Sequence, residues 1–241
     1  MKMLQTSAQL ADAAVFTSAY ARGLYSGYFR RLQSLPTVVV PPPFSIDPEA
    51  TIRREVDVPS PFVLSASTFN RYKKIVETVE GYARSDSSGQ YHLVLAGGFP
   101  EQDYHKEVLR AISDSGVSDQ IHVLGHRSRE ELAWLYEHAS AFVFASTTEN
   151  AGAFALLDAL AFGLPTASSQ MSSMPEMNGQ AVVPLDPTDP VSVAKAMDVV
   201  TDPDYAPILA RRAKQRASQS PTWDEAVDIL FNFLIPLSER Q

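Results

Sequence analysis

The segment from Ile121 to Glu176 is the most informative part of the chain and reads IHVLGHRSREELAWLYEHASAFVFASTTENAGAFALLDALAFGLPTASSQMSSMPE. Short runs of β-branched and aromatic residues, typical of buried strands, alternate in it with segments of helical periodicity. The order is strand, helix, strand, helix, strand, and short polar loops join them. Strands that alternate with helices at this spacing predict a parallel sheet covered by helices.

The pattern continues on both sides of this stretch. Ser128 and Glu131 predict a capping box for the helix that follows residue 128. The expected fold class is α/β, with a doubly wound, Rossmann-like parallel sheet whose ligand lies beyond the carboxyl ends of the strands. We expect strands over 62–66, 91–96, 121–124, 141–145, 165–169 and 181–184, and helices over about 71–84, 102–115, 129–138, 153–162, 189–200, 205–218 and 222–235.

Three consecutive prolines, Pro41 to Pro43, mark the best candidate domain boundary. Prolines end sheet pairing and stiffen the backbone, so residues 41–60 are predicted to be a linker. Before it, 1–40 predict a helix–strand–helix–strand unit, with helices over 1–13 and about 19–33 and strands over 14–18 and 37–40. After it, 61–241 are predicted to form the sheet domain with its C-terminal helices.

Composition excludes several classes of function. The chain has 241 residues, no cysteine and a formal net charge of −8. The missing cysteines exclude disulfides, thiolate catalysis and Cys-ligated metals. The acidic balance argues against a nucleic-acid partner. No stretch approaches the roughly 20 apolar residues of a membrane span, and the N-terminus lacks the apolar run of a signal peptide. We therefore expect a cytoplasmic protein. The histidines lack metal-ligand spacing, and no metal site or cofactor is predicted.

The loop Ser146–Ala153 and the helix after it are the first candidate for chemistry. Its small residues and Gly152 would let backbone amides approach an anion, to which the helix start adds its positive end. Asp158, about one and a half turns into the helix, suits the vicinal hydroxyls of a ribose. Alternatively, Glu149 is a helix-start acid and Asp158 a surface charge; the pattern leaves both open. Under the first of these interpretations, the loop and the helix after it indicate a nucleotide-sugar site.

A second candidate is FVLSASTFNRYKKI, residues 62–75, in which a buried strand leads to Arg71, Lys73 and Lys74. Cations at the carboxyl end of a strand can neutralise a diphosphate leaving group. The alternative is a solvated basic face. Gly97 and Gly98, after the strand 91–96, either bring backbone close to a ligand or form a plain tight turn.

Together these segments resemble the C-terminal, donor-binding domain of retaining GT-B glycosyltransferases of the group 1, or family 4, type. The resemblance runs from about Ala11 to about Leu230. It implies a nucleoside-diphosphate-sugar donor, UDP- or GDP-linked, transfer with retention at the anomeric carbon, and no need for a metal. Six fragments carry it in order: ADAAVFTSAY, VVVPPPF, HVLGHRSREELAWLYEHASAFVFAS, LLDALAFGLPTASS, SSMPE and PTWDEAVDIL.

The resemblance also assigns site residues, with departures. The family places two glutamates eight positions apart. Asp158 matches the second, but eight positions before it stands Asn150, so either Asn150 takes the donor-sugar role or a one-residue insertion lets Glu149 serve. Lys73 matches the lysine of the family's basic pair, whereas Thr68 occupies the arginine position and Arg71 is a candidate substitute. The implied catalytic residues are Lys73, Glu149 and Asn150, and the implied donor-binding residues are Thr68, Arg71, Gly97, Arg127, Gly152, Ala153 and Asp158.

By this resemblance, 1–35 correspond to the tail of the family's N-terminal, acceptor-binding domain, and we expect the rest of that domain to be missing from these 241 residues. The resemblance therefore implies half of an active site, completed by a further domain or a partner chain and acting on an acceptor that the sequence does not identify. The alternative is a non-catalytic, degenerate subunit that stabilises a partner transferase, with the apolar face of the helix 19–33 as its interface. A third hypothesis is that the chain is a sugar-nucleotide epimerase of similar architecture.

Overall fold

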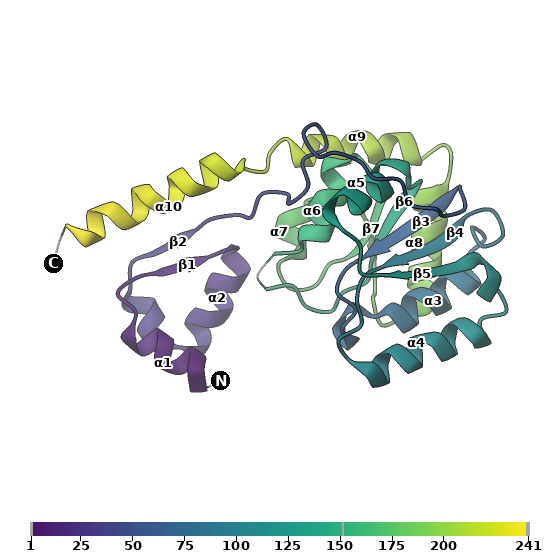
Figure 1. Cartoon of the computed structure of the whole chain (residues 1–241). Helices are drawn as coiled ribbons and strands as arrows, with labels where there is room; N and C mark the ends of the chain where they lie inside the picture. The colour runs from purple at the N-terminus through teal and green to yellow at the C-terminus, as the bar shows by residue number, and fades with distance from the viewer. Residues whose placement is uncertain (1, 151, 240–241) are drawn as a thin grey trace.

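The computed structural model describes residues 2–150 and 152–239. Figure 1 shows a large α/β body, a smaller N-terminal unit beside it, and the long helix α10 (Trp223–Ser238) that leaves the body and extends over the N-terminal unit. The segment between the two parts has neither helix nor strand from residue 40 to residue 61.

The body is built on a six-stranded sheet in which every strand pair is parallel. Its strand order is β5-β4-β3-β6-β7-β8, so the chain reverses its direction of progress between β3 and β6. Open α/β sheets bind their ligands at such a switch point, outside the carboxyl ends of the strands. The prediction of a doubly wound parallel sheet is confirmed. The strands are β3 (Phe62–Ala66), β4 (His92–Ala96), β5 (Ile121–Gly125), β6 (Ala141–Phe144), β7 (Thr166–Ser169) and β8 (Val183–Leu185).

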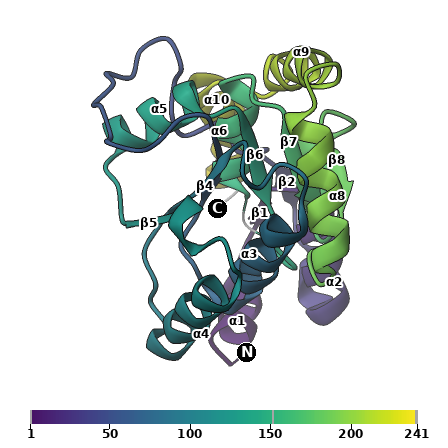
Figure 2. The same ribbon diagram turned by 90° about the vertical axis from the view of Figure 1, so that its right-hand side faces the viewer.

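Helices cover both faces of this sheet. The helices α3 (Ile75–Arg84), α4 (Gln102–Asp114) and α8 (Pro190–Thr201) share one core cluster, and α5 (Arg129–His138), α6 (Phe154–Ala161) and α7 (Met174–Asn178) share the other. Figure 1 and Figure 2 show α5 on one side of the sheet and α3 and α4 on the other. Because both faces are covered, β3 and β6 are buried along their whole length.

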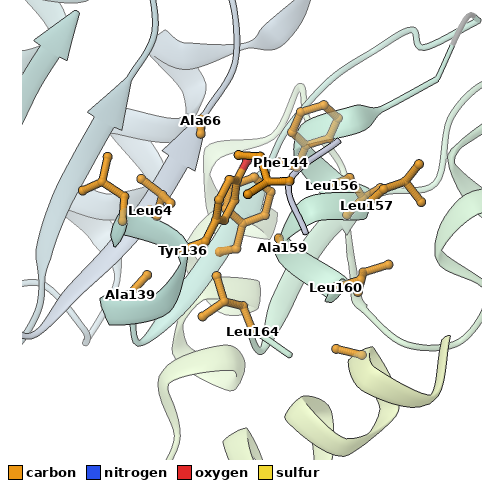
Figure 3. Packing of buried hydrophobic residues seen from close by; sticks show 14 of the residues in the cluster. Leu64, Ala66, Tyr136, Ala139, Phe144, Leu156, Leu157, Ala159, Leu160 and Leu164 are labelled. Carbon is orange, nitrogen blue, oxygen red and sulfur yellow. The ribbon is translucent and has the colours of Figure 1, made fainter. Parts of the chain in front are cut away.

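Neighbouring strand residues feed opposite clusters. Leu64 packs on the α5–α6 side and Val63 on the α3–α8 side, as the period of two in a strand requires. Figure 3 shows Tyr136 of α5 lying between Leu64 of β3 and the leucines of α6. The Tyr136 hydroxyl also donates to the Ala155 carbonyl at 3.2 Å, which ties α5 to the start of α6, the helix that carries Asp158.

Most predicted boundaries agree with the structure within two residues, and the predicted capping box of Ser128 and Glu131 is present at the start of α5. The helix expected over 71–84 is wrong at its start. Residues Arg71–Lys73 form a 3-10 turn, Lys74 adopts a left-handed conformation with φ 52°, and only then does α3 begin. A left-handed residue interrupts the helical path, so the cations do not share one helix face.

The N-terminal unit consists of α1 (Lys2–Leu10), β1 (Ala14–Phe16), α2 (Ala19–Tyr28) and β2 (Thr37–Val39). The strand predicted over 14–18 is shorter because Ser18 caps α2, its side chain accepting from the Ala21 amide at 3.0 Å. The helix predicted over 19–33 ends at Tyr28, and a separate 3-10 turn follows over Arg30–Ser34. Met1, the first residue of the predicted helix 1–13, lies outside the described residues.

The strands β1 and β2 form a parallel pair of their own. The predicted linker packs on the body, because Ile46 and Val56 are buried within the α5–α6 cluster. The division of the chain at 41–60 stays a prediction.

Candidate functional site

A cavity of about 450 Å³ opens at the carboxyl ends of β3, β4 and β5, beside the switch point of the sheet. The loops after these three strands line it together with α5, the start of α6 and the linker. Four of the predicted site residues, Thr68, Gly97, Arg127 and Asp158, lie around this cavity. They come from different elements and meet because parallel strands end at one edge of the sheet.

Gly97 brings two strand ends into close approach. Its amide donates to the Gly125 carbonyl at 2.8 Å. A β-carbon at this position would lie 1.6 Å from the Ser67 carbonyl oxygen, so only glycine fits. The neighbouring Gly98 has open space where a β-carbon would be. Gly97 is therefore required for the shape of the cavity floor.

Asp158 is buried, with 3% of its surface exposed, and the linker holds its carboxylate. Its Oδ1 accepts from the amides of Ser45, at 2.6 Å, and Ile46, at 2.9 Å; its Oδ2 accepts from the Ser45 hydroxyl at 2.6 Å. Burial raises the pKa of Asp158, and the hydrogen bonds from Ser45 and Ile46 oppose that rise. The alternative that Asp158 is a surface charge is wrong.

Lys73 and Glu149 form an ion pair that is set apart from the residues lining the cavity. Their side chains are 11% and 10% exposed, and the Lys73 ammonium lies 4.6 Å from the centre of the Phe144 ring. Glu149 also accepts from the Ser146 hydroxyl at 2.8 Å. Burial lowers the pKa of Lys73, and the attraction of the Glu149 carboxylate opposes that change.

Asn150 contacts other parts of the chain. Its Oδ1 accepts from the Ser172 hydroxyl at 2.7 Å, and its carbonyl accepts from the Thr17 hydroxyl at 3.2 Å. It thus joins the segment before α7 to the N-terminal unit. Of the two candidates for the donor-sugar role, Glu149 is the one whose side chain meets Lys73.

The other predicted residues also lie outside the cavity lining. Arg71 is exposed and donates to Glu107, with 2.8 Å between its second terminal nitrogen and the carboxylate; this hydrogen bond raises the pKa of Arg71. Gly152 has φ 118° and would place a β-carbon 3.2 Å from Pro42. The Ala153 amide donates to the Met177 sulfur at 3.2 Å. The roles of these residues stay predictions, and residue 151 of the loop lies outside the described part of the chain.

Several residues that line the cavity were not predicted from the sequence, among them Ser45 and Ile46 of the linker, Leu132 and Tyr136 of α5, and Phe154 at the start of α6. The four-residue spacing of Leu132 and Tyr136 is a signal that could have placed both on one helix face. Burial, with the nearby Asp158 charge, raises the pKa of Tyr136, whose hydroxyl donates to the Ala155 carbonyl at 3.2 Å.

Arg127 retains unused hydrogen-bonding capacity. Its terminal nitrogens contact the Leu124 carbonyl and, at 3.6 Å, the Glu131 carboxylate. Its Nε is buried and finds no acceptor among the described residues. Within residues 2–150 and 152–239, no cluster of three or more histidine or carboxylate side chains is placed to hold a metal. In the same residues, no helix combines the length and apolar character needed to cross a bilayer.

Known proteins share both the sequence pattern and the fold. O-antigen chain mannosyltransferase B of Escherichia coli is 28% identical over 145 residues, which cover 59% of this chain and 37% of that protein. The structure of HepE from Anabaena, in complex with UDP and glucose, superposes with a TM-score of 0.80 at 18% identity, over 99% of this chain and 66% of that one. Sucrose-phosphate synthase from Thermosynechococcus elongatus gives 0.81 at 19% identity, over 100% and 62%.

The chain thus spans about a third of the length of that mannosyltransferase and less than two thirds of the synthase. The family model of glycosyl transferases group 1 matches residues 49–219, which hold the whole six-stranded sheet and all the residues that line the cavity except Ser45 and Ile46. The chain belongs to the group 1 family of glycosyltransferases.

Proposed function

We propose that this chain binds a nucleoside-diphosphate sugar and supplies the donor-binding, C-terminal half of a retaining hexosyltransferase of family 4. The observation that carries the proposal is the cavity at the switch point, where Thr68, Gly97, Arg127 and Asp158 meet within a group 1 glycosyltransferase domain. A mannosyltransferase relative and a neighbour that holds UDP and glucose support a hexose donor linked to UDP or GDP.

In this proposal the bond between the anomeric carbon and the diphosphate oxygen breaks, and the electron pair stays on the diphosphate. Lys73 stabilises that developing negative charge. Asp158 serves the ribose, and Glu149 rather than Asn150 faces the donor sugar, because its carboxylate lies beside the Lys73 ammonium. The acceptor hydroxyl attacks from the face that the diphosphate leaves, and its proton passes to the departing diphosphate oxygen, which holds the released electron pair. No metal or cofactor takes part.

Two features of the structure support the need for a second half. The strands β1 and β2 form a two-stranded parallel sheet, an arrangement that rarely stands alone. Helix α10 presents Trp223, Val227, Phe231 and Ile235 at four-residue spacing, and Trp223 and Phe231 are 56% and 55% exposed. A further domain or a partner chain that contributes the acceptor site would cover such surfaces.

Isothermal titration with UDP, GDP and ADP tests donor binding. We expect at least one of them to bind, with the same affinity in EDTA and in Mg²⁺. Leu132 lines the cavity, and Leu132→Trp should abolish binding by filling it. Leu109 lies exposed on α4, so Leu109→Trp, the matched control, should bind like the wild type. Failure of every nucleotide at millimolar concentration would contradict the proposal.

A non-catalytic subunit is the second candidate, and two contacts favour it. Arg71 is bound to Glu107, and the Lys73 charge is already neutralised by Glu149. If no nucleotide binds and the chain co-purifies from its source with a second glycosyltransferase chain, this candidate replaces the first.

A further inference from the structure

The Asp158 carboxylate has little capacity left for a ligand. Oδ1 accepts two backbone amides, those of Ser45 and Ile46, and a carboxylate oxygen has about two lone-pair positions. Oδ2 accepts the Ser45 hydroxyl and keeps one position. Asp158 therefore cannot accept both hydroxyls of a vicinal diol while the linker stays where it is.

The Ser45 hydroxyl has the capacity that Asp158 lacks. It donates its one hydrogen to Asp158 Oδ2, so both of its own lone pairs are free to accept. Ser45 lines the cavity and is half-buried, whereas Asp158 is almost fully buried beneath the linker. A ligand in the cavity has readier access to Ser45 than to the carboxylate that orients it.

We propose that Ser45, held in place by Asp158, is a specificity-determining residue that accepts one hydroxyl of the donor's ribose, while the remaining position of Asp158 Oδ2 accepts the other. This inference rests on the proposed function. It also gives a physical account of the aspartate at a position where the resembled family has glutamate. The side chain is one methylene shorter, and the Ser45 hydroxyl, 2.6 Å from Asp158 Oδ2, supplies a further acceptor beside it.

The test is calorimetric titration of wild type and variants with the tightest-binding nucleoside diphosphate and with its 2′,3′-dideoxy form. Removing one acceptor by Ser45→Ala should weaken binding of the ribonucleotide about 10-fold, the equivalent of one hydrogen bond. The dideoxy form has no hydroxyl to lose, so its affinity should change less than about 2-fold. Ser45→Thr keeps the hydroxyl and should bind like the wild type.

Ser85→Ala is the matched control, since it removes another hydrogen bond from a serine to an aspartate, that of Ser85 to Asp198. Ser85 lies before the amino end of β4, whereas the cavity lies at the carboxyl ends of the strands. It should leave both affinities unchanged. If Ser45→Ala does not fold, Ser45→Cys replaces it, because a thiol is a weak acceptor. An equal loss for both nucleotides, or no loss for either, would overturn the role of Ser45 while donor binding stands. A wild type that binds neither nucleotide refutes the proposed function itself.

Discussion

The buried pair of Lys73 and Glu149 gives the sharpest prediction about stability. We expect Glu149→Gln to lower the free energy of unfolding by about 3 kcal/mol, because it leaves the Lys73 ammonium buried without its counter-charge. The substitution keeps the shape of the side chain and an oxygen that can accept from Ser146. The loss therefore reports the charge and not the packing.

The magnitude follows from burial and from the neighbouring ring. Breaking a buried ion pair from one side costs about 3–5 kcal/mol. The Phe144 ring, 4.6 Å from the ammonium, compensates by about 1 kcal/mol, which places the expected loss at the lower end. Lys73→Met should cost about the same, since it leaves the carboxylate unpaired. The double variant has no unpaired charge and should be more stable than either single variant.

Urea denaturation followed by circular dichroism at pH 7 measures these differences. Lys106 and Asp103 form an ion pair whose side chains are largely exposed, and Asp103→Asn, the matched control, should cost less than about 0.5 kcal/mol. A loss below about 1 kcal/mol for Glu149→Gln, or a double variant as unstable as the two single losses combined, would contradict an unpaired buried charge as the cause.

The pH dependence of the same variant has a definite sign. Burial lowers the pKa of Lys73, so between that lowered pKa and the ordinary value of 10.5 the unfolded chain binds more protons than the folded one. Stability therefore rises with pH across that window. Glu149→Gln removes the attraction that opposes the shift, so the rise should begin at lower pH in the variant than in the wild type.

Three further predictions concern single groups. Gly97→Ala should lower the free energy of unfolding in urea by more than about 2 kcal/mol, because its β-carbon would meet the Ser67 carbonyl. Gly98→Ala should lower it by less than about 1 kcal/mol, since open space lies there. Equal losses for the two variants would contradict this prediction. Burial raises the pKa of Asp158, so between the ordinary value of 3.8 and that raised pKa the folded chain binds more protons than the unfolded one, and stability falls as pH rises. Asp158→Asn should remove this slope in urea denaturation measured over that pH range. A slope that persists in the variant would contradict Asp158 as its source. The Glu176 carboxylate accepts from the first two amides of α2, at 2.8 and 2.5 Å. Glu176→Gln should therefore speed hydrogen exchange in α2 and leave exchange in the sheet unchanged. Unchanged exchange in α2 would show that this contact does not stabilise the helix.

The fold could be predicted from the sequence because its determinants are local. The apolar runs of β3 and β6 mark fully buried strands, and the capping box at Ser128 and Glu131 marks a helix start within one residue. The predictions were wrong at two element boundaries that local capping and backbone conformation decide. Ser18 leaves its strand to cap α2, and Lys74 turns left-handed before α3.

The site could be predicted only in part for the same reason. Thr68, Gly97 and Arg127 each follow a strand, so the parallel sheet alone brings them together. The pairing of Lys73 with Glu149 joins residues 76 positions apart, and the hold of Ser45 on Asp158 joins residues 113 apart. Neither contact has a periodic signal, and the proline-rich composition around Ser45 indicates a spacer instead of a wall of the cavity.

These two contacts share a physical cause. A buried charge without a partner costs several kcal/mol, so the folded chain satisfies Lys73 with Glu149 and Asp158 with the linker before any ligand arrives. A diphosphate that reaches Lys73 must share its ammonium hydrogens with Glu149 or displace it, and little net electrostatic energy remains for affinity. Selectivity then has to come from groups with unused capacity: the lone pairs of the Ser45 hydroxyl, the open position on Asp158 Oδ2, and the buried Nε of Arg127, which has no acceptor within the described chain. Hydrogen bonds around the cavity therefore decide the choice of nucleoside, and the ion pair of Lys73 and Glu149 adds little to affinity, so its part in the proposed function lies in the transfer step.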